Sequence, residues 1–252
     1  MINLVISGCG GKMGQVVARL AAQDGALQTV CGIDPYDTKM HDFPVVKHPD
    51  ECLCKADVVI DFSHPDMLPG LLAYGKQNHV ALVLATTGLS EEQVREIHAA
   101  AKEIPIFKSA NMSLGVNLLI NLVKKAAAVL EDTFDIEIIE KHHNQKIDAP
   151  SGTALMIADE IAKVLTNKPE YVYDRHSVRQ KRAKNEIGLH AVRGGTIVGE
   201  HEVLFAGGDE IIEITHKAMS KEVFAAGAIK AAKFLAGKGA GLYDMADLMQ
   251  DA

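Results

Sequence analysis

The chain has 252 residues, 48% of them hydrophobic, which is enough for one large domain or two ordinary domains with separate cores. Its net charge of −7 provides no overall attraction to nucleic acid or to an anionic membrane surface, so we expect neither as a partner. No apolar run approaches the roughly 20 residues of a membrane-spanning helix, and the first residues lack a signal-peptide pattern; we expect a cytoplasmic protein.

The N-terminal part of the sequence alternates between strand-like and helix-like patterns. Short apolar runs rich in β-branched residues predict strands at 2–6, 27–33, 58–62, 81–86 and 104–107. Residues 13–21 show the spacing of an amphipathic helix, and Ser90 followed by two glutamates is typical of a helix start. This alternation predicts a fold of the α/β class, a Rossmann-type doubly wound parallel sheet with helices on both faces.

The first predicted strand leads into the segment VISGCGGKMG, which carries glycines at Gly8, Gly10, Gly11 and Gly14. Glycine suits this place because the turn is tight and the backbone must come close to a pyrophosphate at a helix N-terminus. The match to G-x-G-x-x-G is imperfect, since Met13 occupies the third glycine position. The context between a strand and a helix favours a dinucleotide site, and a glycine turn without a ligand is the alternative.

Asp34 ends the second predicted strand, where a carboxylate can accept hydrogen bonds from the adenosine ribose hydroxyls. A carboxylate there repels the 2′-phosphate of NADP, and neither Pro35 nor Tyr36 offsets that repulsion. The sequence therefore favours NADH. Lys12 in the glycine loop and Lys39 nearby can accommodate a phosphate, which leaves NADPH as the alternative coenzyme.

Small polar residues follow the next three predicted strands. The segments are DFS at 61–63, ATTG at 85–88 and SANMS at 109–113. Ligands of open α/β sheets bind outside the carboxyl ends of the strands, so we expect these segments close to the coenzyme. Ordinary loop chemistry is the alternative.

The four cysteines, Cys9, Cys31, Cys52 and Cys54, all lie in the first quarter of the chain. Without a secretory signal we expect reduced thiols rather than disulfides. Cys52 and Cys54 stand two apart, but no other cysteine or nearby histidine pair completes a zinc spacing in the sequence. We interpret them as structural and predict no metal site.

After Ser113 the pattern changes to a long helix followed mainly by strands. Helical patterns cover 114–130, 154–165 and 220–235, and strand-like stretches cover 134–140, 188–192, 196–205 and 210–216. This order predicts a second, C-terminal α+β domain with a mixed sheet. The segment GKGAGLYDM indicates a glycine-rich turn into a short tail, and the five basic residues between 175 and 184 indicate a solvated loop rather than a phosphate-binding patch.

The segment EKHHNQKIDAPSGTA, residues 140–154, concentrates titratable side chains just before a predicted helix. We expect that helix to begin within 151–153, where hydroxyls and free backbone N–H groups at its positive end suit a carboxylate. Lys146 adds a positive charge, and His142 or His143 can donate a proton near neutral pH.

Each of these side chains can also have a plain structural role. A single histidine is usually structural, Lys146 can be solvated, and Asp148 can cap a turn. Their concentration beside a predicted anion-binding helix end favours a site over several unrelated structural roles.

Five segments together resemble the dihydrodipicolinate reductase family: GCGGKMG, IEKHHNQKIDAPSGTA, HAVRGGTIVGEHEVLF, EITHKA and GLYDM. The resemblance runs from the first strand to the tail, and its His-His-x-x-Lys-x-Asp-x-Pro-Ser-Gly-Thr stretch is specific to that family. It implies NAD(P)H-dependent reduction of 4-hydroxy-tetrahydrodipicolinate in the diaminopimelate route of lysine biosynthesis. It also implies a dinucleotide-binding domain of residues 1–112 and 221–252, a substrate-binding and oligomerisation domain of residues 113–220, and a homotetramer.

Position in the family's motifs implies roles for individual residues. His142 resembles the proton donor that completes hydride transfer to ring carbon C4, with Lys146 assisting and binding substrate. Substrate contacts are implied for His143, Ser151, Gly152 and Thr153. Coenzyme contacts are implied for Gly8, Cys9, Gly10, Gly11, Lys12, Met13, Asp34, Ala85, Thr86, Thr87, Ser109, Ala110, Asn111 and Met112. Two residues depart from the family pattern: Ala85 replaces a frequent glycine, and Pro35 stands where some members have an arginine.

Two other functions fit part of the pattern. An aspartate-semialdehyde dehydrogenase also has two domains and a nicotinamide coenzyme, but it needs a nucleophilic cysteine in the second domain. Every cysteine here precedes residue 55. A dinucleotide-sensing regulator without catalysis would need a DNA-binding helix pair or a basic face, which the acidic composition disfavours.

Overall fold

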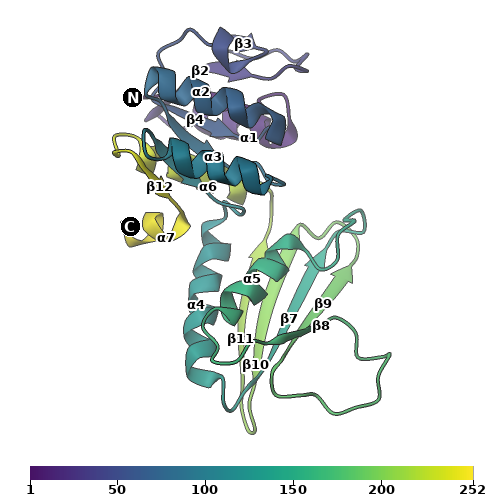
Figure 1. Cartoon of the computed structure of the whole chain (residues 1–252). Helices are drawn as coiled ribbons and strands as arrows, with labels where there is room; N and C mark the ends of the chain where they lie inside the picture. Colours follow the sequence, from purple (N-terminus) through teal and green to yellow (C-terminus); the bar gives the residue numbers. More distant parts are fainter. Residues whose placement is uncertain (252) are drawn as a thin grey trace. The chain divides into compact units, whose positions relative to one another are not determined.

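The computed structural model describes residues 1–251, which divide into two compact units. Unit 1 combines both ends of the chain, Met1–Leu114 and the residues from Glu222 onward, and unit 2 is Gly115–Lys221 (Figure 1). The cores are separate, with two apolar clusters in unit 1 and one in unit 2. In the described part of the chain, no helix has both the length and the apolar composition needed to cross a bilayer.

Unit 1 is built on a seven-stranded sheet in which every pair of neighbouring strands is parallel. In spatial order the strands are β12 (Gly241–Tyr243), β6 (Pro105–Lys108), β5 (Ala81–Leu84), β4 (Val58–Asp61), β1 (Ile2–Ser7), β2 (Leu27–Ile33) and β3 (Val45–Val46). The central strands are buried on both faces, which explains why their sequences are continuous apolar runs rather than alternating ones.

Helices cover both faces of this sheet. One apolar cluster joins it to α1 (Lys12–Ala22) and α6 (Glu222–Leu235), and the other joins it to α2 (Leu68–Asn78) and α3 (Glu91–Ala100). The short α7 (Met245–Gln250) packs with α6, and the 3₁₀ turns η1 (Pro49–Glu51) and η2 (Pro65–Met67) precede β4 and α2. The predicted doubly wound α/β fold is confirmed.

Local chemistry fixes two of these helices. Ser90 caps α3: its hydroxyl accepts the Gln93 N–H at 3.2 Å, and the Gln93 side chain accepts the Ser90 N–H at 2.9 Å. Helix α6 approaches the loop after β6 so closely that a Cβ on Gly227 would lie 1.6 Å from the Met112 carbonyl oxygen. Only glycine permits this contact, which ties the C-terminal segment of unit 1 to its N-terminal part.

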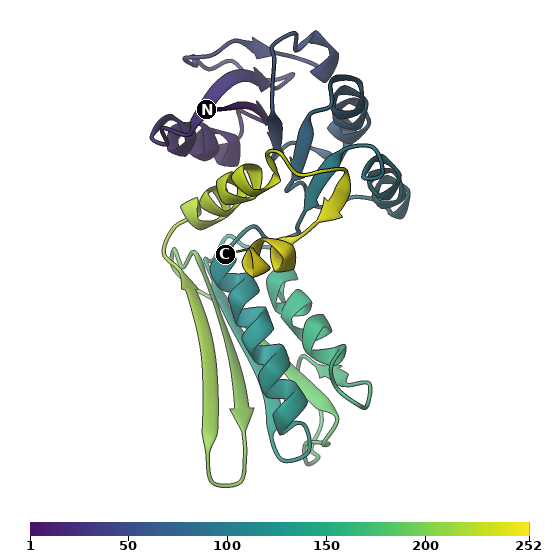
Figure 2. The ribbon, with the colours of Figure 1, turned by 90° about the vertical axis from the view of Figure 1, so that its left-hand side faces the viewer.

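Unit 2 places two helices against one face of a five-stranded mixed sheet, α4 (Leu114–Leu130) and α5 (Gly152–Ala162) (Figure 2). The strand order is β11 (Ile211–Ala218), β10 (Gly199–Ala206), β7 (Asp135–His142), β9 (Glu186–Arg193) and β8 (Glu170–Val172). Strand β10 is antiparallel to both of its neighbours, whereas β7, β9 and β8 run parallel. The predicted α+β arrangement with a mixed sheet is confirmed.

Burial alternates along β7. Ile136, Ile138, Glu140 and His142 are buried, and the residues between them are half-buried. Because successive side chains of a strand point to opposite faces, Glu140 and His142 lie on the face that α4 and α5 cover. The strand thus carries two titratable side chains into an otherwise apolar face.

The prediction for the glycine-rich segment near the C-terminus is wrong. GKGAGLYDM is not a simple turn and tail: Gly241–Tyr243 pairs with β6 as an edge strand and leads into α7. The basic stretch is a surface loop, as predicted, with four of its five basic residues exposed and additional ion pairs. Arg175 pairs with Glu137 and Glu186, and Arg182 pairs with Glu137 and Asp135. Its charges hold a surface loop to the acidic residues of unit 2's own sheet.

Candidate active site

The glycine loop of unit 1 forms a tight turn between β1 and α1. Gly8 has φ +78°, and a Cβ on Gly14 would lie 2.1 Å from the Gly8 carbonyl oxygen. Helix α1 therefore starts directly against the loop, and its N-cap residue, Gly11, provides no side chain to satisfy the first N–H groups. This geometry fits a pyrophosphate held by backbone N–H groups at a helix N-terminus.

Asp34 and Lys39 both contact the glycine loop. The Asp34 carboxylate accepts the N–H groups of Gly10 and Tyr36, each at 3.0 Å, and the Lys39 ammonium donates to the Gly10 carbonyl. Burial, with the nearby carboxylates, raises the pKa of the Cys9 thiol to about 12, so Cys9 stays neutral and packs as an apolar side chain. One anion and one cation thus stand where the adenosine end of a dinucleotide is expected.

The strand register brings the other predicted segments of unit 1 to one edge of the sheet. Ser7, Asp61, Leu84 and Lys108, the last residues of β1, β4, β5 and β6, are paired neighbour to neighbour. The residues that follow them include the predicted contacts at 85–87 and 109–112, so these lie at the carboxyl edge that also carries the glycine loop. The sheet therefore gathers the predicted coenzyme residues of unit 1 along a single edge.

A buried acid, Asp61, organises two of these loops. Its carboxylate accepts the Ser63 hydroxyl at 2.5 Å and the Thr86 hydroxyl at 2.6 Å. Burial raises the pKa of Asp61 and outweighs these hydrogen bonds, which lower it. The next loop is held by Asn111, whose side-chain oxygen accepts the Ser113 N–H at 2.9 Å.

In unit 2, the carboxylate of Glu140 is fully buried and accepts hydrogen bonds from three elements. Both terminal nitrogens of Arg193 in β9 donate to it at 2.7 Å, the Ser151 N–H before α5 donates at 3.0 Å, and His142 Nδ1 lies 2.6 Å away. Burial would raise the pKa of Glu140, but the hydrogen bonds from Arg193 and His142 outweigh it and hold that pKa below its usual range. Glu140 is therefore an anion at neutral pH.

Glu140 fixes the orientation of the His142 ring. The ring is 9% exposed, and its Nδ1 is occupied by the carboxylate. Its other nitrogen, Nε2, faces Gly199, where an added Cβ would lie only 3.1 Å away. A buried carboxylate at Nδ1 fixes the orientation of the imidazole ring and leaves Nε2 as the nitrogen that Glu140 does not contact.

His201 in β10 completes the cluster. Its Nε2 lies 3.1 Å from the Ser151 hydroxyl, and its ring packs edge-on against His142 with centroids 5.3 Å apart. Burial, with a smaller contribution from the His142 charge, lowers the pKa of His201 to about 4, so this ring is neutral at physiological pH. The cluster thus contains a neutral histidine beside the one that Glu140 holds.

The N-terminus of α5 holds a carboxylate in this structure, and that carboxylate belongs to the chain itself. Asp148 lies 2.8 Å from the Lys146 ammonium and also accepts the Gly152 N–H. The Lys146 hydrogen bond is the main reason that the pKa of Asp148 is lowered. Lys146 and the first turn of α5 therefore act on one carboxylate together, as expected for an anion site.

The predicted substrate contacts of unit 2 are not equivalent. Ser151 is buried as the N-cap of α5, with its hydroxyl accepting the Ala154 N–H at 3.2 Å. Gly152 is exposed, and no atom lies within 4 Å of the place a Cβ would take. His143 and Thr153 are half-buried beside them. Ser151 is therefore engaged in capping α5, while the backbone of Gly152 is exposed.

Glu140, Arg193 and His201 are absent from the set predicted by sequence. Glu140 and Arg193 lie within two of the segments that resemble the family. The sequence does not show that they meet, because their contact joins residues 53 positions apart. In the same way, the Ser151–His201 contact joins residues 50 positions apart. One signal was available for Glu140: it ends the strand predicted at 134–140, and extending that strand by two residues would place His142 on the same face.

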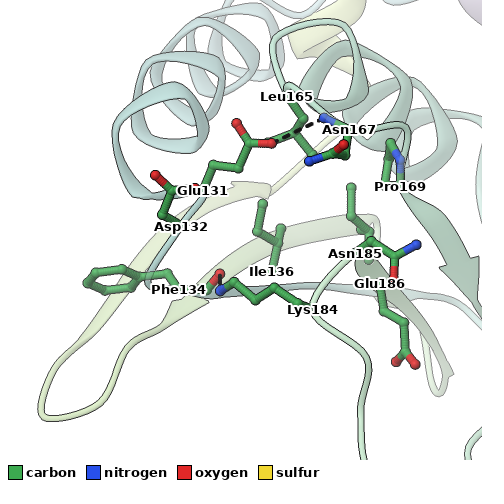
Figure 3. A pocket seen from close by; sticks show the side chains of 11 residues that line it. Glu131, Asp132, Phe134, Ile136, Leu165, Asn167, Pro169, Lys184, Asn185 and Glu186 are labelled. Carbon is green, nitrogen blue, oxygen red and sulfur yellow. Dashed lines mark hydrogen bonds between the residues drawn. The ribbon is translucent and has the colours of Figure 1, made fainter.

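A cavity of about 250 Å³ in unit 2 is separate from this cluster (Figure 3). It is lined by Phe134 and Ile136 at the beginning of β7 and by Glu186 and Ile187 at the beginning of β9, whereas His142 and Arg193 end those strands. The cavity therefore lies at the opposite end of the sheet from the buried carboxylate.

Comparison with known proteins decides the family. Family models described as dihydrodipicolinate reductase, N-terminus, and dihydrodipicolinate reductase, C-terminus, match residues 2–112 and 115–249. The chain belongs to the dihydrodipicolinate reductase family. It is 58% identical over 99% of both chains to 4-hydroxy-tetrahydrodipicolinate reductase of Caldanaerobacter subterraneus subsp. tengcongensis, and 49% identical over 99% of both chains to that of Clostridium novyi.

A solved structure shows the same fold. Dihydrodipicolinate reductase from Paenisporosarcina sp. TG-14, with dipicolinate bound, has a TM-score of 0.81 and 25% sequence identity, with 97% of each chain covered. The predicted family and the predicted enzyme class, an NAD(P)H-dependent oxidoreductase, are confirmed.

We expect the buried His201 to make stability depend on pH. Unfolding lets this side chain bind a proton near its ordinary pKa of 6.5, whereas in the fold it does so only near pH 4. The free energy of unfolding should therefore fall by up to about 3 kcal/mol as pH falls from 6.5 to 4. Urea unfolding of native protein and of His201→Gln at several pH values measures this, and the variant should lose most of that dependence.

The control for this measurement is His98→Gln, which changes an exposed histidine. It should keep the full pH dependence of the native chain. Equal slopes of unfolding free energy against pH for native protein and His201→Gln would show that His201 is not the group responsible. Glu140 adds its own loss of stability from about pH 5 downward, because its pKa is lowered in the fold. Native protein and His201→Gln share this loss, so the difference between them reports on His201.

Proposed function

We propose that this protein reduces 4-hydroxy-tetrahydrodipicolinate to tetrahydrodipicolinate with a reduced nicotinamide coenzyme, in the diaminopimelate route to lysine. The main support is family membership over nearly the whole chain. The observation that carries the chemistry is the His142–Glu140 pair, a histidine fixed by a fully buried carboxylate. The relative solved with dipicolinate supports a cyclic dicarboxylate as the ligand class.

Unit 1 is the dinucleotide-binding domain in this proposal. The glycine loop and the start of α1 hold the pyrophosphate, Asp34 meets the adenosine ribose, and residues 85–87 and 109–112 line the same edge of the sheet. The 4-hydroxyl of the substrate leaves as water, which gives the unsaturated ring of dihydrodipicolinate. When bound, the reduced nicotinamide would supply a hydride, which we assign to ring carbon C4 of that ring.

Unit 2 provides substrate binding and the proton. Lys146 and the Gly152 N–H bind a substrate carboxylate, in place of the Asp148 carboxylate that they contact in this structure. His143 and Thr153 add contacts at the same end of α5. A ring that accepts a hydride gains negative charge, and we assign its neutralisation to a proton from Nε2 of His142.

Glu140 acts as a positioning residue in this mechanism. Its carboxylate holds Nδ1 of His142 at 2.6 Å and so directs Nε2 as the donor. Arg193 and the Ser151 N–H hold the carboxylate in place.

His142→Gln should lower kcat by roughly 10²-fold or more, because it removes the proton donor while preserving side-chain polarity. Coenzyme binding, measured by quenching of protein or coenzyme fluorescence, should change little. Steady-state oxidation of the coenzyme gives kcat. An unchanged kcat would remove His142 from this role.

Two further variants separate chemistry from structure. Glu140→Gln should lower kcat and also shift the alkaline limb of the pH–rate profile, where a proton donor loses its proton, which a purely structural role would not do. His190→Gln is the matched control, since His190 lies 2.7 Å from Glu137 in a similar pair whose side chains point to the other face of the sheet. It should leave kcat and its pH profile unchanged when the variant has the same assembly mass as native protein.

The coenzyme preference should follow from Asp34. We propose that NADH is preferred, since the carboxylate repels a 2′-phosphate, while Lys39 at the Gly10 carbonyl permits NADPH. Asp34→Asn should lower kcat/KM for NADH relative to NADPH by about 10-fold or more, the effect of losing a hydrogen bond to a charged group. Asp42→Asn, an exposed acid of the same segment, is the control.

The assay generates substrate in situ from pyruvate and aspartate semialdehyde with the preceding synthase, and it compares NADH with NADPH. Turnover with a higher kcat/KM for NADH supports both the reaction and the role of Asp34. Turnover that strongly favours NADPH keeps the reaction and contradicts the role of Asp34. Tight dinucleotide binding without turnover contradicts the reaction and favours a dinucleotide sensor.

We also propose a homotetramer with its contacts in unit 2. Helices α4 and α5 cover one face of that sheet, and among the described residues no helix of the unit packs on the other. That open face carries Ile139 and Leu204 among its charged side chains, all only half-buried. Sedimentation equilibrium should give four times the chain mass of 27.1 kDa, and a monomeric mass would contradict the proposal.

A further inference from the structure

Three of the four cysteines meet in unit 1, on the sheet face covered by α2 and α3. Cys31 lies in β2, and Cys52 and Cys54 follow η1. Their sulfur atoms all lie within 4.8 Å of one another. Sequence spacing alone pairs Cys52 with Cys54; the fold adds Cys31 from a strand well before them.

The distances suit a metal ion held by thiolates. Zinc–sulfur bonds of about 2.3 Å in a tetrahedral site place sulfur atoms about 3.8 Å apart. Here the Cys52 and Cys54 sulfurs are 3.2 Å apart, and the largest separation in the group is at most 4.8 Å. Rotations that move each sulfur by roughly half an ångström therefore reach the geometry of a zinc site.

Two of the three cysteines are buried, and a neighbouring cavity gives access to the sulfur atoms. Cys31 and Cys52 are almost fully buried, and Cys54 is half-buried. A cavity of about 270 Å³ is lined by Cys52, Cys54 and Tyr74, so an ion or a water molecule can reach the sulfurs. The Tyr74 hydroxyl lies 3.5 Å from the Cys52 sulfur and can orient a fourth ligand.

Neither apolar packing nor a disulfide accounts for the whole of this arrangement. Cysteines that pack only as small apolar side chains have no reason to place three sulfurs together. A disulfide would join two of the sulfurs and leave the third unused. The second group of three metal-ligating side chains in the described residues, Cys9, Asp37 and His41, is different, because His41 already pairs with Asp37 at 2.5 Å.

We propose that Cys31, Cys52 and Cys54 form a binding site for a thiophilic divalent cation, Zn²⁺, with water as the fourth ligand. The site lies within unit 1 and ties β2 to the loop before β4. Its role is structural, since it adds bonds between two segments that meet in one apolar cluster. It does not depend on the proposed reductase reaction.

The test uses reduced, tag-free full-length protein freed of metal by a chelator. Cd²⁺ serves as a spectroscopic probe, because cadmium–thiolate bonds absorb in the near ultraviolet in proportion to the number of thiolates. Absorption should rise to saturation at one equivalent, and Zn²⁺ added in excess should reverse it. In Cys54→Ser the saturated absorption should fall by about one third, because one of three thiolates is lost, and Zn²⁺ affinity should fall roughly 10²-fold.

Cys9→Ser is the matched control, since Cys9 is the only other cysteine and belongs to the other candidate group. It should retain full Cd²⁺ absorption. Zn²⁺ should also raise the melting temperature of native protein and of Cys9→Ser but not that of Cys54→Ser. Native protein without thiolate absorption, or equal absorption in native protein and Cys54→Ser, would overturn the proposal, as would loss of the signal in Cys9→Ser alone.

Discussion

The active-site end of unit 2 depends on one buried negative charge. Placing a carboxylate in a fully buried position costs several kcal/mol unless charged and hydrogen-bonding partners surround it. Glu140 obtains those partners from Arg193 in β9, the Ser151 N–H before α5 and His142 on its own strand. The need to satisfy this charge therefore fixes the ends of two strands and a helix relative to one another, and the orientation of the histidine follows.

Unit 1 contains a buried acid whose pKa is shifted in the opposite direction from that of Glu140. Asp61 and Glu140 are similarly buried, yet the pKa of Asp61 is raised and that of Glu140 is lowered. The difference lies in the donors. Asp61 is held by neutral hydroxyls and a backbone amide, whereas Glu140 faces a guanidinium and an imidazole. Asp61 therefore organises loops, and Glu140 also fixes the orientation of the neighbouring His142 ring.

Most of the fold and part of the site could be predicted because they rest on local patterns. Five of the seven strands of unit 1, the helix at 114–130 and the glycine turn all show in neighbouring residues. Long-range contacts leave no such signal in neighbouring residues. Arg193 and His201 reach the site through the register of strands far apart in sequence, and Cys31 reaches Cys52 in the same way. The edge strand β12 was missed because three residues beside a glycine-rich turn carry almost no periodic signal.

Because unit 1 is built from both ends of the chain, it cannot be completed early in translation. Helix α6 supplies much of one apolar cluster, including Ala225, Ala228, Ala231 and Leu235. While the ribosome is still producing unit 2, that face of the sheet is covered by α1 but not yet by α6, and β6 is an edge strand. The nascent N-terminal segment must therefore remain soluble with a partly exposed apolar face until the last residues emerge, which makes it a natural client for a chaperone.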